Sequence, residues 1–452
     1  MNENIDLRAL ALETLLTVKK SRAKLGDVLN QELKKYGYLS KEKRAFYTRL
    51  TEGTLEQKML LDHFIGIYSK TPVRKLKPVV RNILRLAFYQ IIYMDSVPDS
   101  AAVNEAVKLT VKKGFGPLKG FVNGILRSAV REPERMRLPD REDILRYISV
   151  KYSMPEFIVK QWLEEYGAGT TEKICGSFLK DKKTSIRIRG CKGDVKECIS
   201  LLESDGVNVE KAPYLNCAYY ISGYDRLYEL EAFRRGMFAV QDVSSMLAVS
   251  AAGIRPGDMV LDVCAAPGGK SMFAADECKD SGKVISRDIS ERKTELIEEN
   301  ARRCGITNIR TEVWDASVFS PEIRERMDVV LVDAPCSGYG IIGKKPDIKY
   351  NASPEKQEEL AKIQKKILDK AAGYVRPGGR LIFSTCTISK MENEENVKTF
   401  LEDNAGFKPL DLTEALPEEI WKNSADTAKD GYIQLLPGVH DCDGFFIAGF
   451  IK

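Results

Sequence analysis

The sequence predicts a multidomain protein with an all-α first part, a small α+β middle part and a C-terminal α/β part built on a mostly parallel, doubly wound sheet. Three observations predict this fold class. At 452 residues the chain is too long for one hydrophobic core. Helical periodicity alone runs through the first third, and apolar strand-like runs alternate with helical stretches through the last half. We therefore place the domains at residues 1–145, 146–235 and 236–452.

The charge of the chain is unevenly distributed. Residues 1–150 contain 28 Lys and Arg against 17 Asp and Glu, a net charge of +11, whereas the remainder contains 42 against 48, a net charge of −6. A basic first part indicates a polyanionic partner, and a solvated basic surface is the alternative that charge alone leaves open.

Composition argues against several classes of protein. The N-terminal segment has no hydrophobic signal core, and the longest apolar runs, such as residues 86–94, are far shorter than the roughly 20 residues that span a bilayer. None of the ten cysteines precedes Cys175, no C-x-x-C pair occurs, and the chain has only two histidines. We expect a cytoplasmic protein with no membrane segment, no disulfide framework and no metal site. Nothing in the sequence demands more than a monomer.

The first part is predicted to be a bundle of helices. Apolar residues recur at helical spacing from Leu7 onward, and “RNILRLAFYQIIYM” and “AAVNEAVKLTVKK” continue the pattern. Turn signals interrupt it at “TPVRKLKP” and “GFGPLKG”. The charged, proline-bearing stretch “REPERMRLPDRED” that follows is typical of a linker.

The middle part mixes helical and strand patterns. The stretches “YSMPEFIVKQWLEEYG” and “DVKECISLLESDG” are helical, whereas “TSIRIRG” and “NCAYYISG” alternate like half-buried strands. We expect a small ferredoxin- or RRM-like unit with an exposed sheet. Such sheets bind RNA in other proteins, but the nearly balanced charge here leaves RNA contact open.

Five short apolar runs predict the sheet of the last part: “DMVLDV”, “KVISRD”, “IRTEVW”, “DVVLVD” and “RLIFST”. The stretch between the last two predicts a long helix, with Ser353 as its N-cap and Pro354 at its first position. We expect Pro377, Gly378 and Gly379 to end that helix.

A turn rich in small residues follows the first of these strands, in “LDVCAAPGGKS”. Small side chains let the main chain approach a ligand, and Lys270 and Ser271 then open a helix whose N-terminal amides can hold a polar group. The turn lacks both G-x-G-x-x-G and the P-loop spacing. The candidate cofactor contacts in it are Cys264, Ala265, Ala266, Pro267, Gly268, Gly269 and Lys270.

Three acids follow the next three strands, and they indicate which cofactor the turn suits. Asp288 ends the second strand, 19 residues after Gly269, which is the spacing at which an acid binds ribose hydroxyls. Asp315 and Asp333 end the third and fourth strands. Three carboxylates at one edge would repel the pyrophosphate of NAD, whereas S-adenosylmethionine carries a sulfonium and an ammonium group. We therefore predict an S-adenosylmethionine site, although each acid taken singly could be a helix cap or turn residue.

Two cysteines follow the strands that should be neighbours at this edge, Cys336 after the fourth and Cys386 after the fifth. Either one alone is more simply explained as a buried structural thiol. Beside a methyl donor, however, a thiolate can add to carbon 6 of cytosine and make carbon 5 nucleophilic. A base then removes the proton from carbon 5 so that the thiolate can leave. A carboxyl group near ring nitrogen 3 would stabilise the adduct, and Asp333 is placed to do so.

The motifs “CAAPGGK”, “DAPCSG”, “STC” and “FAVQDVSSML” together resemble those of the RNA cytosine-C5 methyltransferases. The stretch from “VPDSAAVNEAV” to “FVNGILR” resembles the helical RNA-binding domain of the antiterminator NusB, so the whole chain is similar to the bacterial Sun/RsmB family of 16S ribosomal RNA methyltransferases. “GKKPDIKY” and “DCDGFF” also match family patterns, although Gly343, Lys344 and Lys345 replace a run expected to be richer in Arg and His.

The resemblance implies residue roles and a substrate. It makes Cys386 the nucleophile and Cys336 the residue that helps release the product, and it assigns the cofactor to Cys264 through Lys270 with Asp288, Asp315 and Asp333. DNA cytosine methyltransferases use a proline-cysteine motif after the fourth strand, which makes Cys336 the rival nucleophile. The implied partner is 16S ribosomal RNA or a small-subunit precursor. The alternatives are a transfer RNA substrate, because the catalytic motifs are shared, and an RNA-binding or assembly factor with a vestigial catalytic part.

Overall fold

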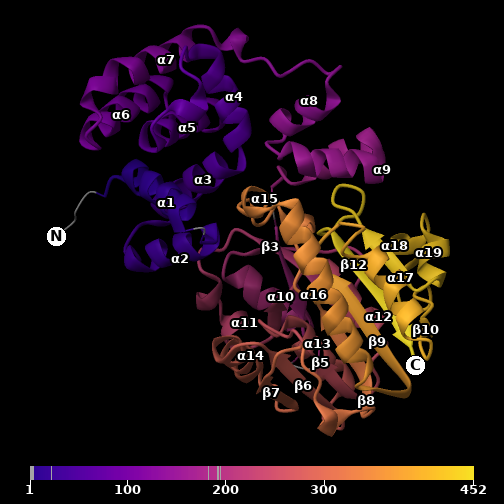
Figure 1. The fold of residues 1–452 in the computed structure, drawn as a ribbon. Helices are drawn as coiled ribbons and strands as arrows, with labels where there is room; N and C mark the ends of the chain where they lie inside the picture. The colour runs from indigo at the N-terminus through magenta and orange to yellow at the C-terminus, as the bar shows by residue number, and fades with distance from the viewer. Residues whose placement is uncertain (1–4, 22, 182, 191–192, 194) are drawn as a thin grey trace. The chain divides into compact units, whose positions relative to one another are not determined.

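We describe the protein from a computed structural model, for residues 5–21, 23–181, 183–190, 193 and 195–452. The chain forms two compact units (Figure 1). The first contains Met1–Leu179 and Ile342–Asn351, and the second contains Lys180–Ile341 and Ala352–Lys452.

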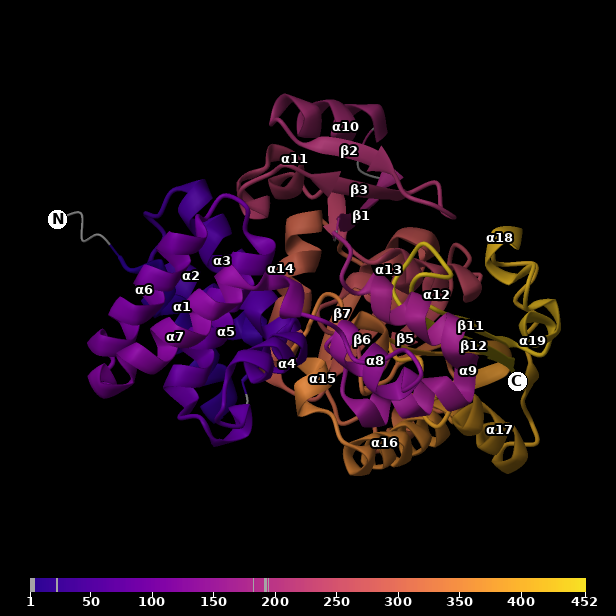
Figure 2. The same ribbon diagram turned by 90° about the horizontal axis from the view of Figure 1, so that it is seen from above.

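The first unit is all helical, as the periodicity predicts. Its core is formed by apolar faces such as those of Leu12, Tyr47, Leu84 and Leu126, and α1, α5 and α7 lie side by side (Figure 2). Its helices are α1 Leu7–Ser21, α2 Leu25–Lys35, α3 Lys41–Glu56, α4 Lys58–Tyr68, α5 Pro78–Tyr93, α6 Asp99–Lys112, α7 Lys119–Arg131, α8 Ile144–Lys151, α9 Glu156–Ser177 and α15 Ile348–Asn351.

The first unit extends beyond residue 145. Helix α8 packs on α4, and the Ser153 hydroxyl accepts a hydrogen bond of 2.8 Å from the Met59 amide at the start of α4. Residues 146–179 are thereby grouped with the helices rather than with the small sheet.

The middle sheet is antiparallel and belongs to the second unit. Its strands follow the order β2-β3-β1-β4, and α10 and α11 pack with them. β4 lies beyond the predicted boundary at 235. Buried ion pairs to Asp276 from Arg187 on β1 and from Arg189 directly after it join this sheet to the last part, which explains why both form one unit. The division into three separately folding domains stays a prediction. The bounds are β1 Thr184–Ile188, α10 Val195–Ser204, β2 Asn208–Lys211, β3 Ala218–Ser222, α11 Glu231–Arg234 and β4 Phe238–Val240.

The larger sheet confirms the predicted Rossmann-like α/β class. Its order is β10-β12-β9-β8-β5-β6-β7, with β11 paired to β12. The five predicted runs form β5 to β9, which are mutually parallel, and the C-terminal strand β12 is antiparallel to β9. The bounds are β5 Met259–Asp262, β6 Lys283–Asp288, β7 Ile309–Val313, β8 Met327–Asp333, β9 Val375–Thr385, β10 Lys408–Pro409, β11 Tyr432–Leu435 and β12 Phe445–Ile451.

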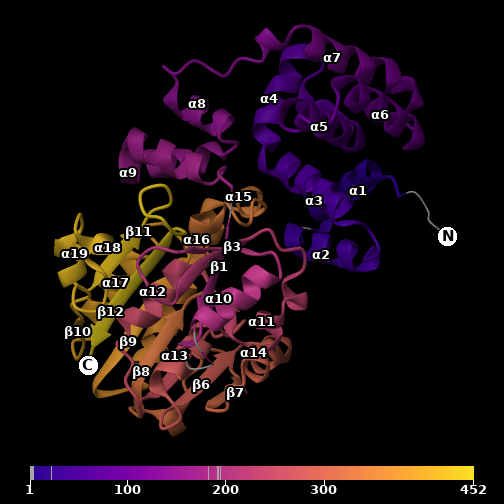
Figure 3. The same cartoon turned by 180° about the vertical axis from the view of Figure 1, so that it is seen from behind.

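Helices cover both faces of the larger sheet, so alternate residues of its strands enter different cores (Figures 1 and 3). On β8, Val329 and Leu331 pack with α12 and α13, whereas Val330 and Val332 pack with α16 and α17. The run is continuously apolar because both faces are buried. The helices of this part are α12 Val243–Ala251, α13 Gly269–Cys278, α14 Glu291–Cys304, α16 Pro354–Ala372, α17 Glu394–Asp403, α18 Glu418–Trp421 and α19 Ala425–Lys429.

The predicted cap of α16 is confirmed, but its predicted end is wrong. The Ser353 side chain accepts a hydrogen bond from the Lys356 amide, and Pro354 is the first helical residue. The helix ends earlier, with Gly373 as its C-cap. Residues 377–379 lie inside β9, where Gly378 has a φ of +74° and its amide donates to the Lys452 carbonyl. The proline and glycines therefore shape an irregular strand start opposite a register shift in β8.

Within the described ranges, no helix is long and apolar enough to cross a bilayer. The same residues contain no group of three or more His, Cys, Asp or Glu side chains that could hold a metal ion. All the described cysteines are free thiols.

Candidate active site

The carboxyl ends of β8 and β9 lie side by side at one edge of the sheet. The two strands are parallel, and their register pairs Asp333 with Ser384. The loop that begins after Asp333 and the residues that follow Thr385 therefore leave the sheet together. Ligands of open α/β sheets bind beyond this edge, near the point where the strand order reverses, which here lies between β5 and β8.

The two cysteines singled out from the sequence meet at this edge. The sulfur atoms of Cys336 and Cys386 are 3.3 Å apart, and both side chains are half-buried. The separation exceeds the roughly 2.05 Å of a disulfide bond, so the contact is between two thiols. The Cys386 sulfur, burial and the nearby Glu392 and Asp333 raise the pKa of Cys336 well above its usual value. This environment disfavours the thiolate form of Cys336.

A buried carboxyl group holds the Cys336 loop in place. Glu392 is fully buried, and it accepts hydrogen bonds from the Ser337 amide at 2.8 Å and from Gln364 Nε2 at 2.9 Å. Gln364 Nε2 also donates to the Pro335 carbonyl at 2.9 Å, which fixes the loop from the other side. Burial raises the pKa of Glu392. Its second oxygen, Oε1, has no hydrogen-bond partner among the described residues.

Two further contacts join the loops that carry the sulfurs. The hydroxyls of Ser337 and Thr387 are hydrogen-bonded at 2.7 Å, and the Gly340 amide donates to the Cys386 carbonyl at 3.0 Å. Each cysteine therefore has a neighbouring residue tied to the opposite loop. This arrangement restricts the separation of the sulfurs.

Asp333 links the thiols to the small-residue turn. Its Oδ2 accepts from Lys270 Nζ at 2.6 Å, and its Oδ1 accepts from the Ser384 hydroxyl at 3.0 Å. The Asp333 side chain is 33% exposed, whereas that of Lys270 is 10% exposed. Lys270, predicted as a cofactor contact, thus holds the carboxylate predicted to face the base.

The small-residue turn, residues 263–268, connects β5 to α13. Gly268 precedes the helix with a φ of +102°, and a Cβ atom there would lie 3.2 Å from Cγ2 of Ile297. Glycine is therefore required by both conformation and space. Directly below, the buried Asp262 accepts a hydrogen bond of 2.7 Å from the Ser271 hydroxyl, and its Oδ1 has no partner within the described part of the chain. Burial raises the pKa of Asp262 to about 6.

Asp288 is part of the same site. Its Oδ2 accepts from the Ala266 amide of the turn at 3.0 Å, and its Oδ1 accepts from the Ile289 amide and from Lys293 Nζ, each at 2.8 Å. Ala265 is also fixed, because its amide donates to the Arg287 carbonyl at 2.8 Å. The turn is thus anchored to the end of β6.

Three other residues predicted at this site are Cys264, Pro267 and Asp315. Cys264 is half-buried, and burial raises the pKa of its thiol. The Pro267 carbonyl accepts from Asn300 at 3.1 Å. Asp315 lies two residues beyond the end of β7, its side chain is exposed, and it accepts a hydrogen bond from the Ser317 amide that lowers its pKa. No contact described for Asp315 joins it to the other acids.

Glu392 and Gln364 were not identified from the sequence. Glu392 lies six residues after Cys386, just before α17, and Gln364 lies in the middle of α16. The one available signal was a polar residue on the apolar face of α16, since Gln364 follows Leu360 by four residues and precedes Ile367 by three.

Comparisons with known proteins agree with this geometry. The family model described as 16S rRNA methyltransferase RsmB/F matches residues 250–451, and that of the NusB family matches residues 6–131. A solved structure of the protein PH0851 has a TM-score of 0.79 and 26% identity, with all of both chains covered. NSun6 from Pyrococcus horikoshii, solved with SFG, has a TM-score of 0.59 and 22% identity over 66% of this chain and 98% of its own, which shows a shared fold.

Curated relatives extend the match over the whole chain. The probable ribosomal RNA small subunit methyltransferase B of Bacillus subtilis (strain 168) is 37% identical over 99% of this chain and 98% of its own. The ribosomal RNA small subunit methyltransferase F of Salmonella agona (strain SL483) is 34% identical over 60% of this chain and 57% of its own. The chain therefore belongs to the RsmB/F family of 16S rRNA methyltransferases, with a NusB-family domain at its N-terminus.

Proposed function

We propose that this enzyme transfers a methyl group from S-adenosylmethionine to carbon 5 of a cytosine in 16S ribosomal RNA, through a covalent bond between Cys386 and carbon 6 of the base. The observation that carries the proposal is the pair of thiols, 3.3 Å apart at the ends of adjacent strands. Methylation of a nucleophilic nitrogen or oxygen would need no cysteine at all, whereas carbon 5 of cytosine must first be activated by a nucleophile.

The residues present fit S-adenosylmethionine. The donor, when bound, supplies an electrophilic methyl group on a positively charged sulfur. The turn from Cys264 to Gly269 consists of small residues, which let its main chain approach a ligand. The acids Asp288 and Asp333 have the charge that suits its sulfonium and ammonium groups, and Asp262 retains an unpartnered buried oxygen behind the turn. Cys264 through Lys270, together with Asp288, Asp315 and Asp333, are the residues that would hold it.

The Cys386 sulfur, burial and the neighbouring acids raise the pKa of Cys336, which disfavours it as the attacking thiolate and supports Cys386 as the nucleophile. Attack by Cys386 on carbon 6 breaks the double bond between carbons 5 and 6. The pair of electrons released at carbon 5 can then form the new bond to the methyl group. Ser337 and Thr387 keep the attacking sulfur beside its neighbour while the adduct exists.

Asp333 and Cys336 act on the adduct. The Asp333 carboxylate, held by Lys270 and Ser384, can accept a hydrogen bond from ring nitrogen 3 when that nitrogen is protonated in the adduct, and so stabilise the altered ring. After methyl transfer a base removes the proton from carbon 5, the double bond re-forms, and the bond between Cys386 and carbon 6 breaks. Cys336, whose sulfur lies 3.3 Å from the departing sulfur, assists this release.

The choice of substrate rests on the basic N-terminal part and on the relatives. Residues 1–150 carry a net charge of +11, and the relatives that match the whole chain are named as small-subunit ribosomal RNA methyltransferases. Transfer RNA is the second candidate, because nothing in the thiol pair itself distinguishes the two RNAs. An assembly factor with an inactive catalytic part is disfavoured by the complete set of thiols and acids.

The test uses labelled S-adenosylmethionine with 16S RNA and with transfer RNA, followed by digestion to nucleosides. We expect label in 5-methylcytidine from 16S RNA; its absence there would refute the proposal. Cys336→Ala should accumulate a covalent protein–RNA complex that survives denaturing electrophoresis, and Cys386→Ala should form none. The opposite pattern would exchange the two roles.

A further inference from the structure

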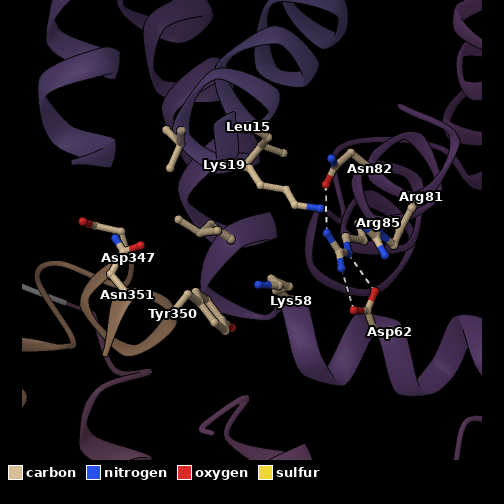
Figure 4. A pocket seen from close by; sticks show the side chains of 12 residues that line it. Leu15, Lys19, Lys58, Asp62, Arg81, Asn82, Arg85, Asp347, Tyr350 and Asn351 are labelled. Carbon is tan, nitrogen blue, oxygen red and sulfur yellow. Dashed lines mark hydrogen bonds and ion pairs between the residues drawn. The ribbon is translucent and has the colours of Figure 1, made fainter. Parts of the chain in front are cut away.

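The first unit contains a polar cavity of about 440 Å³ that the proposed chemistry does not use (Figure 4). It lies among α1, the start of α4, α5 and the segment Ile342–Asn351. Four of its lining residues are basic: Lys19, Lys58, Arg81 and Arg85. Only two, Asp62 and Asp347, are acidic.

One of the four cations is fully paired. Arg85 donates from Nε and Nη2 to the two oxygens of Asp62, at 2.7 and 2.6 Å, and from Nη1 to Asn82 at 3.0 Å. A bidentate pair of this kind is a rigid group with no remaining net charge. It therefore forms one wall of the cavity but does not neutralise the other cations.

The other three cations have no carboxylate partner among the described residues. Lys19 extends from α1 toward Asn82 and Arg85, and Lys58 lies between this group and Tyr350 (Figure 4). Lys58 Nζ is 3.9 Å from the centre of the Tyr350 ring. Arg81 has a buried Nε without a hydrogen bond, and its Nη1 makes only long contacts of 3.5 Å with the carbonyls of Val73 and Arg74.

The electrostatics of the cavity show the effect of this arrangement. Burial is the main cause that lowers the pKa of Lys58 to about 8, and the opposing charges of Arg85 and Asp62 partly offset each other. Burial and the charges of Arg81 and Arg85 lower the pKa of Lys19. Burial raises the pKa of Asp347, and the cavity lining holds four basic side chains against two acidic ones. An anion in the cavity would relieve the repulsion among the cations.

One side of the cavity is formed by a segment that lies far from α1, α4 and α5 in the sequence. Ile342–Asn351 follows Cys336 by only six residues, yet it packs within the helical unit. The Tyr350 hydroxyl is hydrogen-bonded to that of Ser153 at 3.0 Å, and Lys349 Nζ donates to the Glu56 carbonyl at 2.8 Å. A ligand of this cavity would therefore touch the segment that continues from the catalytic loop.

We propose that this cavity binds a phosphate group of the RNA substrate, with Lys19, Lys58 and Arg81 as its ligands. The inference rests on the proposed function and names a substrate contact outside the methyl-transfer site. Two lysines and an arginine around one volume match the charge and the acceptor oxygens of a phosphodiester. The volume exceeds that of a single phosphate, so the adjoining sugar can enter as well. The net charge of +11 around it favours a polyanion over an isolated phosphate ion.

The test measures binding of a 16S RNA transcript to the full-length protein as a function of salt. Loss of one phosphate contact should reduce the slope of log affinity against log salt by about 0.7–0.9. We expect this in Lys19→Gln and in Arg81→Gln, so that a tenfold rise in salt should cost each variant about five- to eightfold less affinity than it costs wild type. Lys108→Gln is the control, because Lys108 is an exposed lysine of the same unit, 73% exposed and paired with Glu105. An equal change in the control, or no change in the two variants, overturns the proposal.

Three further measurements distinguish phosphate binding in this cavity from misfolding of the variants and from binding of an acidic protein. Lys19 lies on an exposed part of α1, so its substitution spares the fold; thermal melting checks Arg81→Gln, whose guanidinium is partly buried. Inorganic phosphate should compete with the RNA for wild type more strongly than for Lys19→Gln. Polyglutamate that displaces the RNA as well as phosphate does would overturn the proposal in favour of an acidic protein partner. Methylation is measured in parallel, so that the proposed function and the proposed phosphate site are tested separately. Absence of 5-methylcytidine would refute the proposed function, whereas the salt slopes test the phosphate site.

Discussion

Replacement of Glu392 should separate stability from catalysis at the thiol pair. In Glu392→Ala, the Ser337 amide and Gln364 Nε2 lose their acceptor inside a site with no solvent exposure. Each buried donor left without a partner costs about 1–3 kcal/mol, so two cost about 2–6 kcal/mol before any cavity is counted. Glu392→Gln keeps the shape and one acceptor oxygen. Because it exchanges charge-assisted for neutral hydrogen bonds but no longer buries a charge, we expect a loss below about 2 kcal/mol.

The assay combines urea unfolding with steady-state methylation. Glu395→Ala is the matched control, since Glu395 lies three residues further on and is exposed. If Glu392 positions the Cys336 loop, Glu392→Gln should lower kcat while leaving the KM for RNA unchanged, and it should slow the disappearance of the covalent complex. A purely structural residue would move the unfolding midpoint alone. Wild-type kcat in Glu392→Gln, or a loss of stability in Glu392→Ala no larger than in the control, would refute this reasoning.

Three other substitutions test the site and its support. Lys270→Met removes the side chain that donates to Asp333 at 2.6 Å. We expect kcat to fall at least tenfold, roughly the rate equivalent of 1.4 kcal/mol, with unchanged RNA affinity. Unchanged kcat would contradict the role given to this pair. The pKa of Asp262 is about 6 in the folded protein, against an ordinary value of 3.8. Between these two pH values the folded state binds more protons than the unfolded state does. The free energy of unfolding should therefore fall by up to about 3 kcal/mol as the pH rises from 3.8 to 6. Asp262→Asn should abolish that fall in chemical denaturation from pH 4 to pH 7, and a persisting fall would assign it elsewhere. Arg189→Met leaves the buried Asp276 with fewer partners and should cost about 3–5 kcal/mol in the same assay, whereas a loss below 1 kcal/mol would show that the two sheets are joined by packing instead.

The arrangement of strand ends was predictable from the sequence because it follows from a general rule. Parallel strands joined by helices all end at one edge of the sheet, so Cys336 and Cys386 were expected together once their strands were recognised. The cap at Ser353 was predictable for a similar reason, since it depends on residues within one turn of the helix. Features of this kind depend on a few neighbouring residues or on the parallel direction of the strands, so they are shared by any sequence with the same pattern.

The contacts that tune the site were not predictable in this way. Lys270 was assigned to the cofactor from its place in the turn, yet it pairs with Asp333, 63 residues away. Pro377 lies at the start of β9 and not at the end of α16. Where β9 enters the sheet is not determined by the sequence of the helix before it. Long-range pairings of single side chains leave no periodic signal, so sequence patterns locate the strands but not the partners of polar groups.

The two sulfurs also show why a second cysteine is needed beside the nucleophile. A lone thiol at the end of β9 could attack carbon 6, but the resulting adduct is a stable thioether until its sulfur can leave. The Cys336 thiol is held 3.3 Å away by a loop that Glu392 and Gln364 fix from beneath. A raised pKa makes Cys336 a poor attacking thiolate, so its place beside the other sulfur fits a role in product release rather than in attack.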